Sequence, residues 1–227
     1  MMENFSNYTR VDPNNHISIT SLRVTGNTIN KNESCYVYKE KRVDYFTGDF
    51  THLFTIKTMT SGVLGSQVYL YGLTNTIDTA NHWVNHSIAV INYCDGDCTS
   101  LLLYRLGYPV AASIEDVPFD TVYYCKLTRV SNTYTLYVYT DADRTNLLDS
   151  ITRTDSNPIS ARCIYALSSY GSGSERPCYG AYIEELNIGE VESGKFELPA
   201  TGIYGYDYEG KEYIKCKVDS EGVLSTS

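Results

Sequence analysis

The sequence predicts an all-β protein, an antiparallel two-sheet sandwich with a short C-terminal β extension. Three observations favour this fold class. Apolar and polar residues alternate in many short runs, turn residues such as Gly, Asn and Asp separate the runs, and no segment longer than about ten residues keeps a helical period. The chain has 227 residues, and sandwiches of roughly 200–250 residues form as single units.

Individual strands are predicted from this alternation. Residues 50–57 place their aromatic side chains on one face, which indicates a half-buried strand. The runs 122–130 and 133–140 are joined by two residues and predict a hairpin. Further strands are expected at residues 16–25, 34–39, 67–73, 87–93, 101–106, 162–168 and 180–188. Together these runs supply enough strands for both sheets of a sandwich.

The composition changes near residue 190. A polar segment that contains Pro199 is followed by a short alternating strand between two turn signals, at 207–210 and 219–222. So few residues cannot hold a hydrophobic core alone. We therefore expect a sandwich over residues 1–190 and a C-terminal extension or anchor over residues 191–227. The extension is expected to pack on the sandwich, on a partner chain or on another copy of itself.

Charge and hydropathy limit the partners. The chain carries 27 acidic and 18 basic residues, a net charge of −9, and no basic run, so no nucleic-acid partner is expected. The longest apolar stretch, 101–112, contains Arg105 and is too short to span a bilayer, so no membrane partner is expected. The N-terminus lacks the basic and apolar regions of a signal peptide, which favours synthesis in a cytoplasm.

Two parts of the chain resemble known families. Residues 36–54, together with the later runs 123–148 and 180–188, resemble strands of concanavalin A-like (laminin-G-like) lectin and glucanase sandwiches. This resemblance covers roughly residues 5–190 and implies a jelly-roll fold without naming a ligand. Residues 212–224 are similar to the C-terminal ending of many tailed-phage structural proteins. That second resemblance implies a protein of the virion.

A catalytic site is not predicted. Glycoside hydrolysis needs two carboxylates with separate roles on one face, and a Glu-x-Asp-x-x-Glu strand pattern that would supply them is missing. The nearest candidates are Glu184, Glu185, Glu190 and the pair Glu115-Asp116. None of the four histidines lies near a recognisable nucleophile motif. We therefore assign no catalytic residue.

Two short acidic turns are candidate calcium sites. Asp95 and Asp97 flank one glycine, Asp141 and Asp143 flank one alanine, and carboxylate oxygens suit Ca²⁺. Tight turns explain the same residues without a metal. No other cofactor is expected. Cys94 and Cys98 bracket the first turn, where a disulfide and two reduced thiols both remain open.

Tyrosine dominates the aromatic residues, with 22 Tyr against 6 Phe and 1 Trp. Tyr and Trp rings stack on the C–H faces of sugars while amides and hydroxyls take the polar edges. The candidate glycan-binding residues are Tyr69, Tyr71, Trp83, Asn85 and Tyr170. The alternative is that the tyrosines pack across strands or between subunits.

These observations predict a non-enzymatic bacteriophage virion structural protein, a capsid decoration, head fibre or tail-associated component located in the virion. Its expected partners are other virion proteins, copies of itself and host-surface glycans. The alternative is a cellular carbohydrate-binding module or a glucanase-like glycoside hydrolase.

Overall fold

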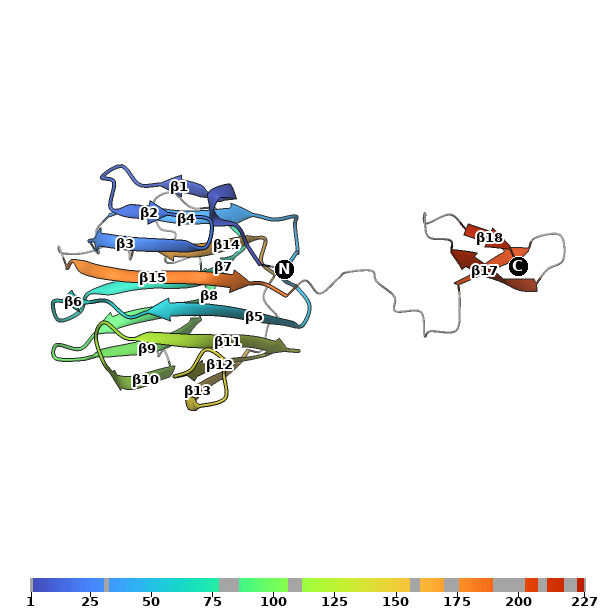
Figure 1. Cartoon of the computed structure of the whole chain (residues 1–227). Coiled ribbons are helices and arrows are strands. Elements are labelled where there is room, and N and C mark those ends of the chain that lie inside the picture. The colour runs from blue at the N-terminus through green and yellow to red at the C-terminus, as the bar shows by residue number, and fades with distance from the viewer. Residues whose placement is uncertain are drawn as a thin grey trace. The chain divides into compact units, whose positions relative to one another are not determined.

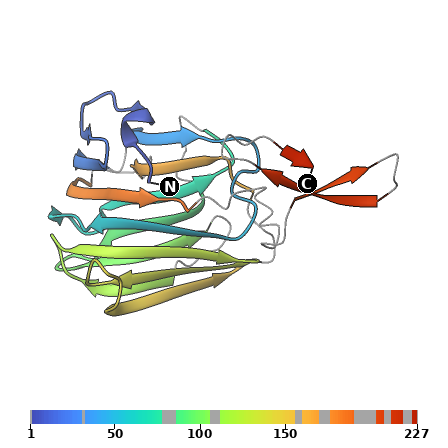
Figure 2. The same cartoon turned by 45° about the vertical axis from the view of Figure 1, so that its right-hand side comes forward.

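The computed structural model describes residues 2–30, 33–77, 86–105, 112–155, 160–169, 176–189, 203–207, 212–218 and 224–226. The chain divides into two compact units, Met1–Val191 and Glu192–Ser227. The first unit is the sandwich, whose two sheets lie face to face (Figures 1 and 2). The second unit holds one antiparallel sheet in the order β16-β17-β18. Its strands are β16 (Ile203–Asp207), β17 (Glu212–Val218) and β18 (Leu224–Thr226).

One sheet of the sandwich has seven strands in the order β1-β4-β14-β7-β8-β9-β10, and every pairing is antiparallel. The strands are β1 (Thr9–Val11), β4 (Tyr36–Glu40), β14 (Cys163–Ser168), β7 (Gln67–Thr74), β8 (His86–Cys94), β9 (Thr99–Arg105) and β10 (Ala112–Val117). Neighbouring strands are often far apart in the sequence, as β4 and β14 are. Such crossovers are what a jelly roll requires.

The other sheet has eight strands in the order β13-β12-β11-β5-β15-β3-β2, with β6 paired to β15. Its strands are β2 (Ile17–Ile19), β3 (Arg23–Ile29), β5 (Phe50–Lys57), β6 (Ser61–Gly62), β11 (Val122–Val130), β12 (Thr133–Tyr139), β13 (Leu147–Thr154) and β15 (Cys178–Asn187). The predicted all-β, antiparallel two-sheet sandwich is confirmed. One 3-10 turn, η1 (Phe5–Asn7), precedes β1, and no helix in the described part of the chain could cross a membrane.

The inner faces of the two sheets form one main hydrophobic core. The alternation in β5 is confirmed, because Phe50, His52, Phe54 and Ile56 are all buried. The predicted hairpin between β11 and β12 is present, and Ser131 in its two-residue turn has φ of 55°. A positive φ is what such hairpin turns need to match the twist of the strands.

One cluster of rings joins the sheets at the centre of this core. The Phe54 ring of β5 stacks on the Tyr71 ring of β7, with centroids 5.0 Å apart and an interplanar angle of 2°. Nδ1 of His52 lies 2.5 Å from the Tyr71 hydroxyl, and the His52 ring stacks on Phe50 at 4.2 Å. Burial lowers the pKa of His52 to about 3, so the imidazole is neutral in the folded protein.

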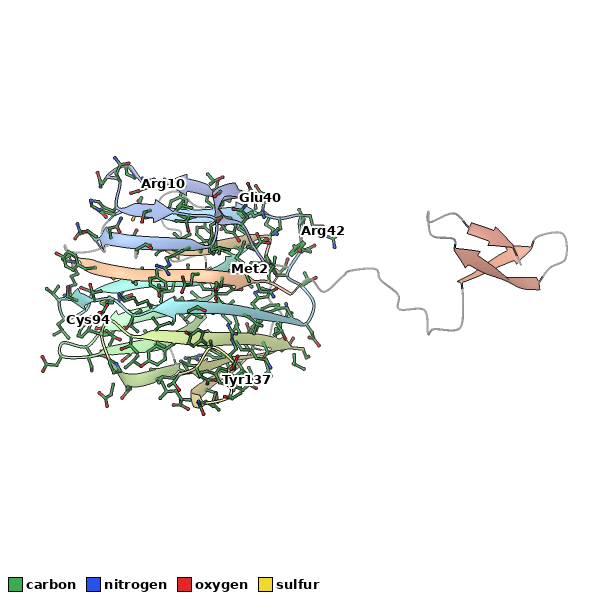
Figure 3. All side chains as sticks on the ribbon, viewed as in Figure 1. Met2, Arg10, Glu40, Arg42, Cys94 and Tyr137 are labelled. Atoms are coloured by element: carbon green, nitrogen blue, oxygen red, sulfur yellow. The ribbon has the colours of Figure 1, made fainter. Side chains whose placement is uncertain are left out.

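The N-terminal residues contact both sheets. Met2 lies beside the end of β15 (Figure 3), and the Glu3 N–H donates to the Leu186 carbonyl at 2.7 Å. The buried Glu3 carboxylate accepts hydrogen bonds from Lys39 Nζ at 2.7 Å and Lys41 Nζ at 2.9 Å. Burial acts to raise the pKa of Glu3, but the two ammonium groups outweigh it and the pKa is lowered. This carboxylate therefore ties β4 to the end of β15.

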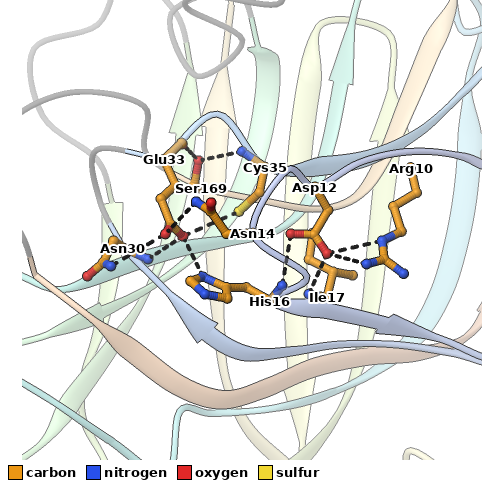
Figure 4. Close-up of polar contacts among 9 residues, drawn as sticks. All are labelled: Arg10, Asp12, Asn14, His16, Ile17, Asn30, Glu33, Cys35 and Ser169. Atoms are coloured by element: carbon orange, nitrogen blue, oxygen red, sulfur yellow. Dashed lines mark hydrogen bonds and ion pairs between the residues drawn. The ribbon is translucent and has the colours of Figure 1, made fainter.

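A second polar cluster fixes the turn between β1 and β2 (Figure 4). The Asp12 carboxylate accepts from the backbone N–H groups of His16 and Ile17, each at 2.9 Å, and pairs with Arg10 Nη2 at 2.6 Å. Nδ1 of His16 lies 2.9 Å from a Glu33 carboxylate oxygen. The cluster satisfies turn amides with side-chain acceptors, which is a structural role.

The buried His52 predicts a loss of stability in acid. The unfolded chain binds a proton near the ordinary pKa of 6.5, whereas the folded chain does so only near 3, so the unfolded state holds more protons between these values. We expect the free energy of unfolding to fall as pH decreases from 6.5 to 3, by up to about 1.4 kcal/mol per pH unit from this group.

Urea unfolding at a series of pH values measures this slope. The control is His52→Gln, which does not titrate and keeps a polar group beside Tyr71. The variant should lose the part of the slope that His52 contributes. Equal slopes in the two proteins would contradict a neutral buried imidazole.

Candidate functional site

The outer face of the seven-stranded sheet carries a band of aromatic and apolar side chains. The pairing register places Tyr38 beside Tyr165 on neighbouring strands, and their rings stack with centroids 5.7 Å apart. A second cross-strand row contains Tyr36, Ser168, Tyr69, Ile91 and Leu102. The aromatic and aliphatic members of these rows pack in two small clusters that are separate from the main core. The face is therefore apolar in part and built on paired strands.

Tyr69 and Tyr71 do not share a face, although alternation predicts that they do. A register shift between them interrupts the pairing of β7 with β8. Leu70 and Tyr71 both enter the main core, and Tyr69 packs on the outer face beside Ile91. A β-bulge of this kind inverts the alternation after it. Tyr71 is fully buried with its hydroxyl against His52, so it does not reach a ligand.

Three of the candidate glycan-binding residues, Trp83, Asn85 and Tyr170, lie outside the described residues. Tyr69 is within them but is 2% exposed, beneath the side chains of its cluster. The sequence-based set of five is thus represented in the structure by one outer-face residue and one core residue.

A pocket of about 390 Å³ lies at one end of this outer face, where β8, β9 and β10 meet. Its walls combine an aromatic ring, an aliphatic side chain, two hydroxyls, a thiol and three carboxylates. The lining residues are Tyr93, Asp95, Cys98, Ser100, Leu102, Ser113, Glu115 and Asp116. Register explains the grouping, since Tyr93 pairs with Ser100 and Leu102 pairs with Ser113, and paired residues share a face.

A bulge in the edge strand β10 brings two adjacent carboxylates to the pocket. The register of β10 against β9 shifts between Ile114 and Val117, and Asp116 has φ of 56°. Consecutive residues in a regular strand point to opposite faces, so Glu115 and Asp116 reach one pocket because the strand is irregular here. Bulges at sheet edges re-aim side chains in this way.

Each pocket carboxylate accepts a hydrogen bond from an uncharged neighbour. Asp95 accepts from the Ser100 hydroxyl, Glu115 accepts from the Ser113 hydroxyl at 3.2 Å, and Asp116 accepts from the Cys98 thiol at 3.5 Å. Burial and the Asp116 carboxylate raise the pKa of the Cys98 thiol. A raised pKa keeps this sulfur as the thiol, which is a poor nucleophile.

The Cys94–Cys98 segment is a tight turn between β8 and β9. Asp95 N–H donates to the Cys98 carbonyl at 3.0 Å, and Gly96 has φ of 113°, a conformation that favours glycine. Cys94, labelled in Figure 3, is buried at the end of β8, and Cys98 is partly exposed. Both are free cysteines in the structure.

The Asp141 carboxylate holds a turn rather than facing a free site. It accepts from the backbone N–H groups of Asn146 at 2.6 Å and Thr145 at 3.1 Å, and from the Thr145 hydroxyl at 2.8 Å. These hydrogen bonds, with that from Asn146 first, lower the pKa of Asp141. Asp95 is likewise engaged by Ser100, and Asp97 and Asp143 are exposed. Within the described ranges, no three His, Cys, Asp or Glu side chains form a metal-ligand group.

The carboxylates weighed for hydrolysis on β15 lie in the other sheet. Glu184 pairs with Arg23, with Arg23 Nε 2.7 Å from the carboxylate oxygen. Glu185 is exposed at a register shift, with φ of 52°, and its N–H donates to the Leu22 carbonyl. Glu190 lies outside the described residues, and of the sequence-based acidic candidates within them, Glu115 and Asp116 line the pocket.

Comparisons with known proteins give similarity in structure only. No protein-family model and no curated protein sequence matches the chain. The PL7 alginate lyase AlyA1 from Zobellia galactanivorans has a TM-score of 0.52 and 10% identity, over 78% of this chain and 81% of that one. A Saccharomyces cerevisiae protein of unknown function has a TM-score of 0.51 and 11% identity, over 82% and 97%.

The exoplasmic/lumenal domain of VIP36, in its Ca²⁺/Man2-bound form, has a TM-score of 0.49 and 10% identity, over 83% of this chain and 88% of that one. The two TM-scores above 0.5 indicate a shared fold, and identities this low leave function to be argued from the site. The resemblance found in the sequence is confirmed at that level: the first unit of this chain is a concanavalin A-like jelly-roll sandwich.

Proposed function

We propose that the chain is a non-enzymatic carbohydrate-binding protein whose ligand occupies the pocket formed by β8, β9 and β10. The composition of the pocket carries the proposal. Tyr93 and Leu102 offer apolar surface to the C–H groups of a sugar ring, and Ser113 and Glu115 offer hydrogen-bonding partners to its hydroxyls. Because these residues stand on paired strands, they are held in place before a ligand binds.

The chemistry of the lining supports binding over catalysis. Its sulfur nucleophile has a raised pKa, and the described lining residues include no histidine that could act as a general base. The three carboxylates are the feature that favours the alternative, a glycoside hydrolase, because that reaction uses a carboxyl pair. The two functions differ in a measurable product, since hydrolysis releases reducing sugars.

Replacement of the aromatic wall tests the site. Tyr93→Ala should weaken binding of an oligosaccharide identified on a glycan array by about tenfold, which corresponds to about 1.4 kcal/mol. The control is Tyr179→Ala, which removes a tyrosine ring that is exposed on the other sheet. Calorimetry on both variants, after thermal melts show that they are folded, checks the prediction.

Equal binding by wild type and Tyr93→Ala would place the ligand elsewhere. Release of reducing ends from the bound oligosaccharide, lost in Glu115→Gln, would support the hydrolase instead.

We further propose that this sandwich is displayed on a bacteriophage particle as a capsid decoration, head fibre or tail-associated protein, where it contacts host-surface glycans. The phage-like ending at residues 212–224 supports this assignment. The separate compact unit Glu192–Ser227, with its own antiparallel sheet, supports a role as the anchor to other virion proteins or to copies of the same chain.

Deletion of residues 196–227 should abolish incorporation into particles and leave the sandwich folded, since the core lies within the first unit. Immunoblots of gradient-purified virions measure incorporation, and the melting temperature of the isolated truncated chain measures folding. A truncated protein that assembles as well as the full chain would refute the anchor.

A variant of Asp141 distinguishes a role in holding the turn from a role as a calcium ligand. Removal of its hydrogen bonds in Asp141→Ala should lower the Tm, because the turn amides of Thr145 and Asn146 lose their side-chain acceptor. If the carboxylate serves the turn, the decrease in Tm is the same with Ca²⁺ as with EDTA. If it binds calcium, wild type shows a Ca²⁺-dependent rise in Tm that the variant lacks.

A further inference from the structure

We propose that the pocket formed by β8, β9 and β10 selects sugars that carry a positively charged amino group and rejects uronates. This inference rests on the proposed function, since it names the class of ligand for the same site. It depends on the charge, the hydrogen bonding and the shape of the lining.

The charge of the pocket is one-sided. Asp95, Glu115 and Asp116 are three of its eight lining residues, and none of the eight is Lys, Arg or His. No ion pair within the described ranges involves these three carboxylates. Two other carboxylates of the same chain are neutralised, Glu3 by two lysines and Glu184 by Arg23. The three pocket carboxylates therefore stand together without a cationic side chain among the lining residues.

The hydrogen bonds inside the pocket leave its charge in place. The donors to the three carboxylates are two hydroxyls and a thiol, all uncharged. A carboxylate has about four lone-pair positions, so each keeps acceptor capacity for a ligand. An ammonium group has three donors and no acceptor, and charge-assisted hydrogen bonds are roughly twice as strong as neutral ones. The lining therefore offers its carboxylates no positively charged donor, and the ammonium group of an amino sugar supplies one.

The arrangement also accommodates the rest of such a sugar. Asp95, Glu115 and Asp116 are exposed, whereas Ser100 is buried and its strand partner Tyr93 is half-buried. A sugar ring that packs on Tyr93 lies in the same pocket as the three carboxylates, within reach of its substituents. A tyrosine ring face also attracts a cation, which adds to the same preference.

A uronate, a sugar that carries a carboxylate, is repelled by the charge of the same pocket. Each sugar of an alginate chain carries a carboxylate, which would approach three like charges in a chain with a net charge of −9. The chain shares its fold with a PL7 alginate lyase, but the charge of this pocket opposes a polyanionic ligand. The shared fold therefore does not imply a shared class of ligand at this site.

Three oligosaccharides of equal length test the inference by calorimetry on the full chain. They are a glucosamine oligomer at a pH where its amines are protonated, its fully N-acetylated form, and a mannuronate oligomer. We expect the glucosamine oligomer to bind at least about tenfold more tightly than the acetylated form, and the mannuronate oligomer not to bind. The difference should shrink as salt is added, because exposed charges are screened.

Two matched variants separate the pocket from the acidic surface in general. Glu115→Gln keeps the shape and removes one charge, and should weaken glucosamine binding about threefold to tenfold with little change for the acetylated oligomer. Glu185→Gln removes one exposed charge from the other sheet and should change neither.

Each outcome of these experiments supports or overturns a stated part of the proposal. Equal binding of the charged and acetylated oligomers overturns the charge preference and leaves carbohydrate binding intact. Mannuronate binding as tight as that of glucosamine overturns the rejection of uronates. Equal effects of Glu115→Gln and Glu185→Gln show attraction to the whole surface and overturn the pocket as its source. If no sugar on the glycan array or in this panel binds, the proposed function itself fails.

Discussion

The contact between β5 and β7 holds the two sheets in place, and the rest of the sandwich depends on it. The parallel stacking of Phe54 on Tyr71 joins a strand at the centre of one sheet to a strand at the centre of the other. The His52–Tyr71 hydrogen bond satisfies two polar groups that would otherwise be buried without partners. With both hydroxyl and imidazole paired, aromatic residues with polar atoms can fill a core that has few phenylalanines.

The two outer faces use tyrosine differently. On the seven-stranded sheet, Tyr36 and Tyr165 are buried in a cluster of their own. On the eight-stranded sheet, Tyr137 (Figure 3) and Tyr124 are half-buried beneath the cationic side chains of Lys126 and Arg144. A cation over an aromatic ring already makes a favourable contact with the face of that ring. On the seven-stranded sheet, Tyr93 instead lines the pocket formed by β8, β9 and β10.

Alternation in the sequence was sufficient to predict the fold and insufficient to predict the site. Strands such as 50–57 and the hairpin at 131–132 follow from a period of two, and both are confirmed. Simple alternation does not hold where the register shifts. It places Tyr69 and Tyr71 on one face, which is wrong, and it gives no reason for Glu115 and Asp116 to lie in one pocket.

The sequence contains enough information to predict the pocket residues Tyr93, Ser100 and Leu102. The turn at 94–98 sets the register of the two predicted strands on either side, so these residues could have been placed on one face. The bulge in β10 has no comparable sequence signal, because a single extra residue in an edge strand leaves composition unchanged.

The attachment of Glu3 to β15 has a consequence for the order of folding during synthesis. The residues that this segment contacts on β4 leave the ribosome early, but its partner Leu186 is made more than 180 positions later. The first residues of the chain must wait for nearly the whole domain before they can take their final place. Contacts between residues so distant in the chain are slow to form, and exposed strand edges are vulnerable until they do. Closure of this end of the sandwich is therefore a late event, which ties completion of the fold to completion of β15.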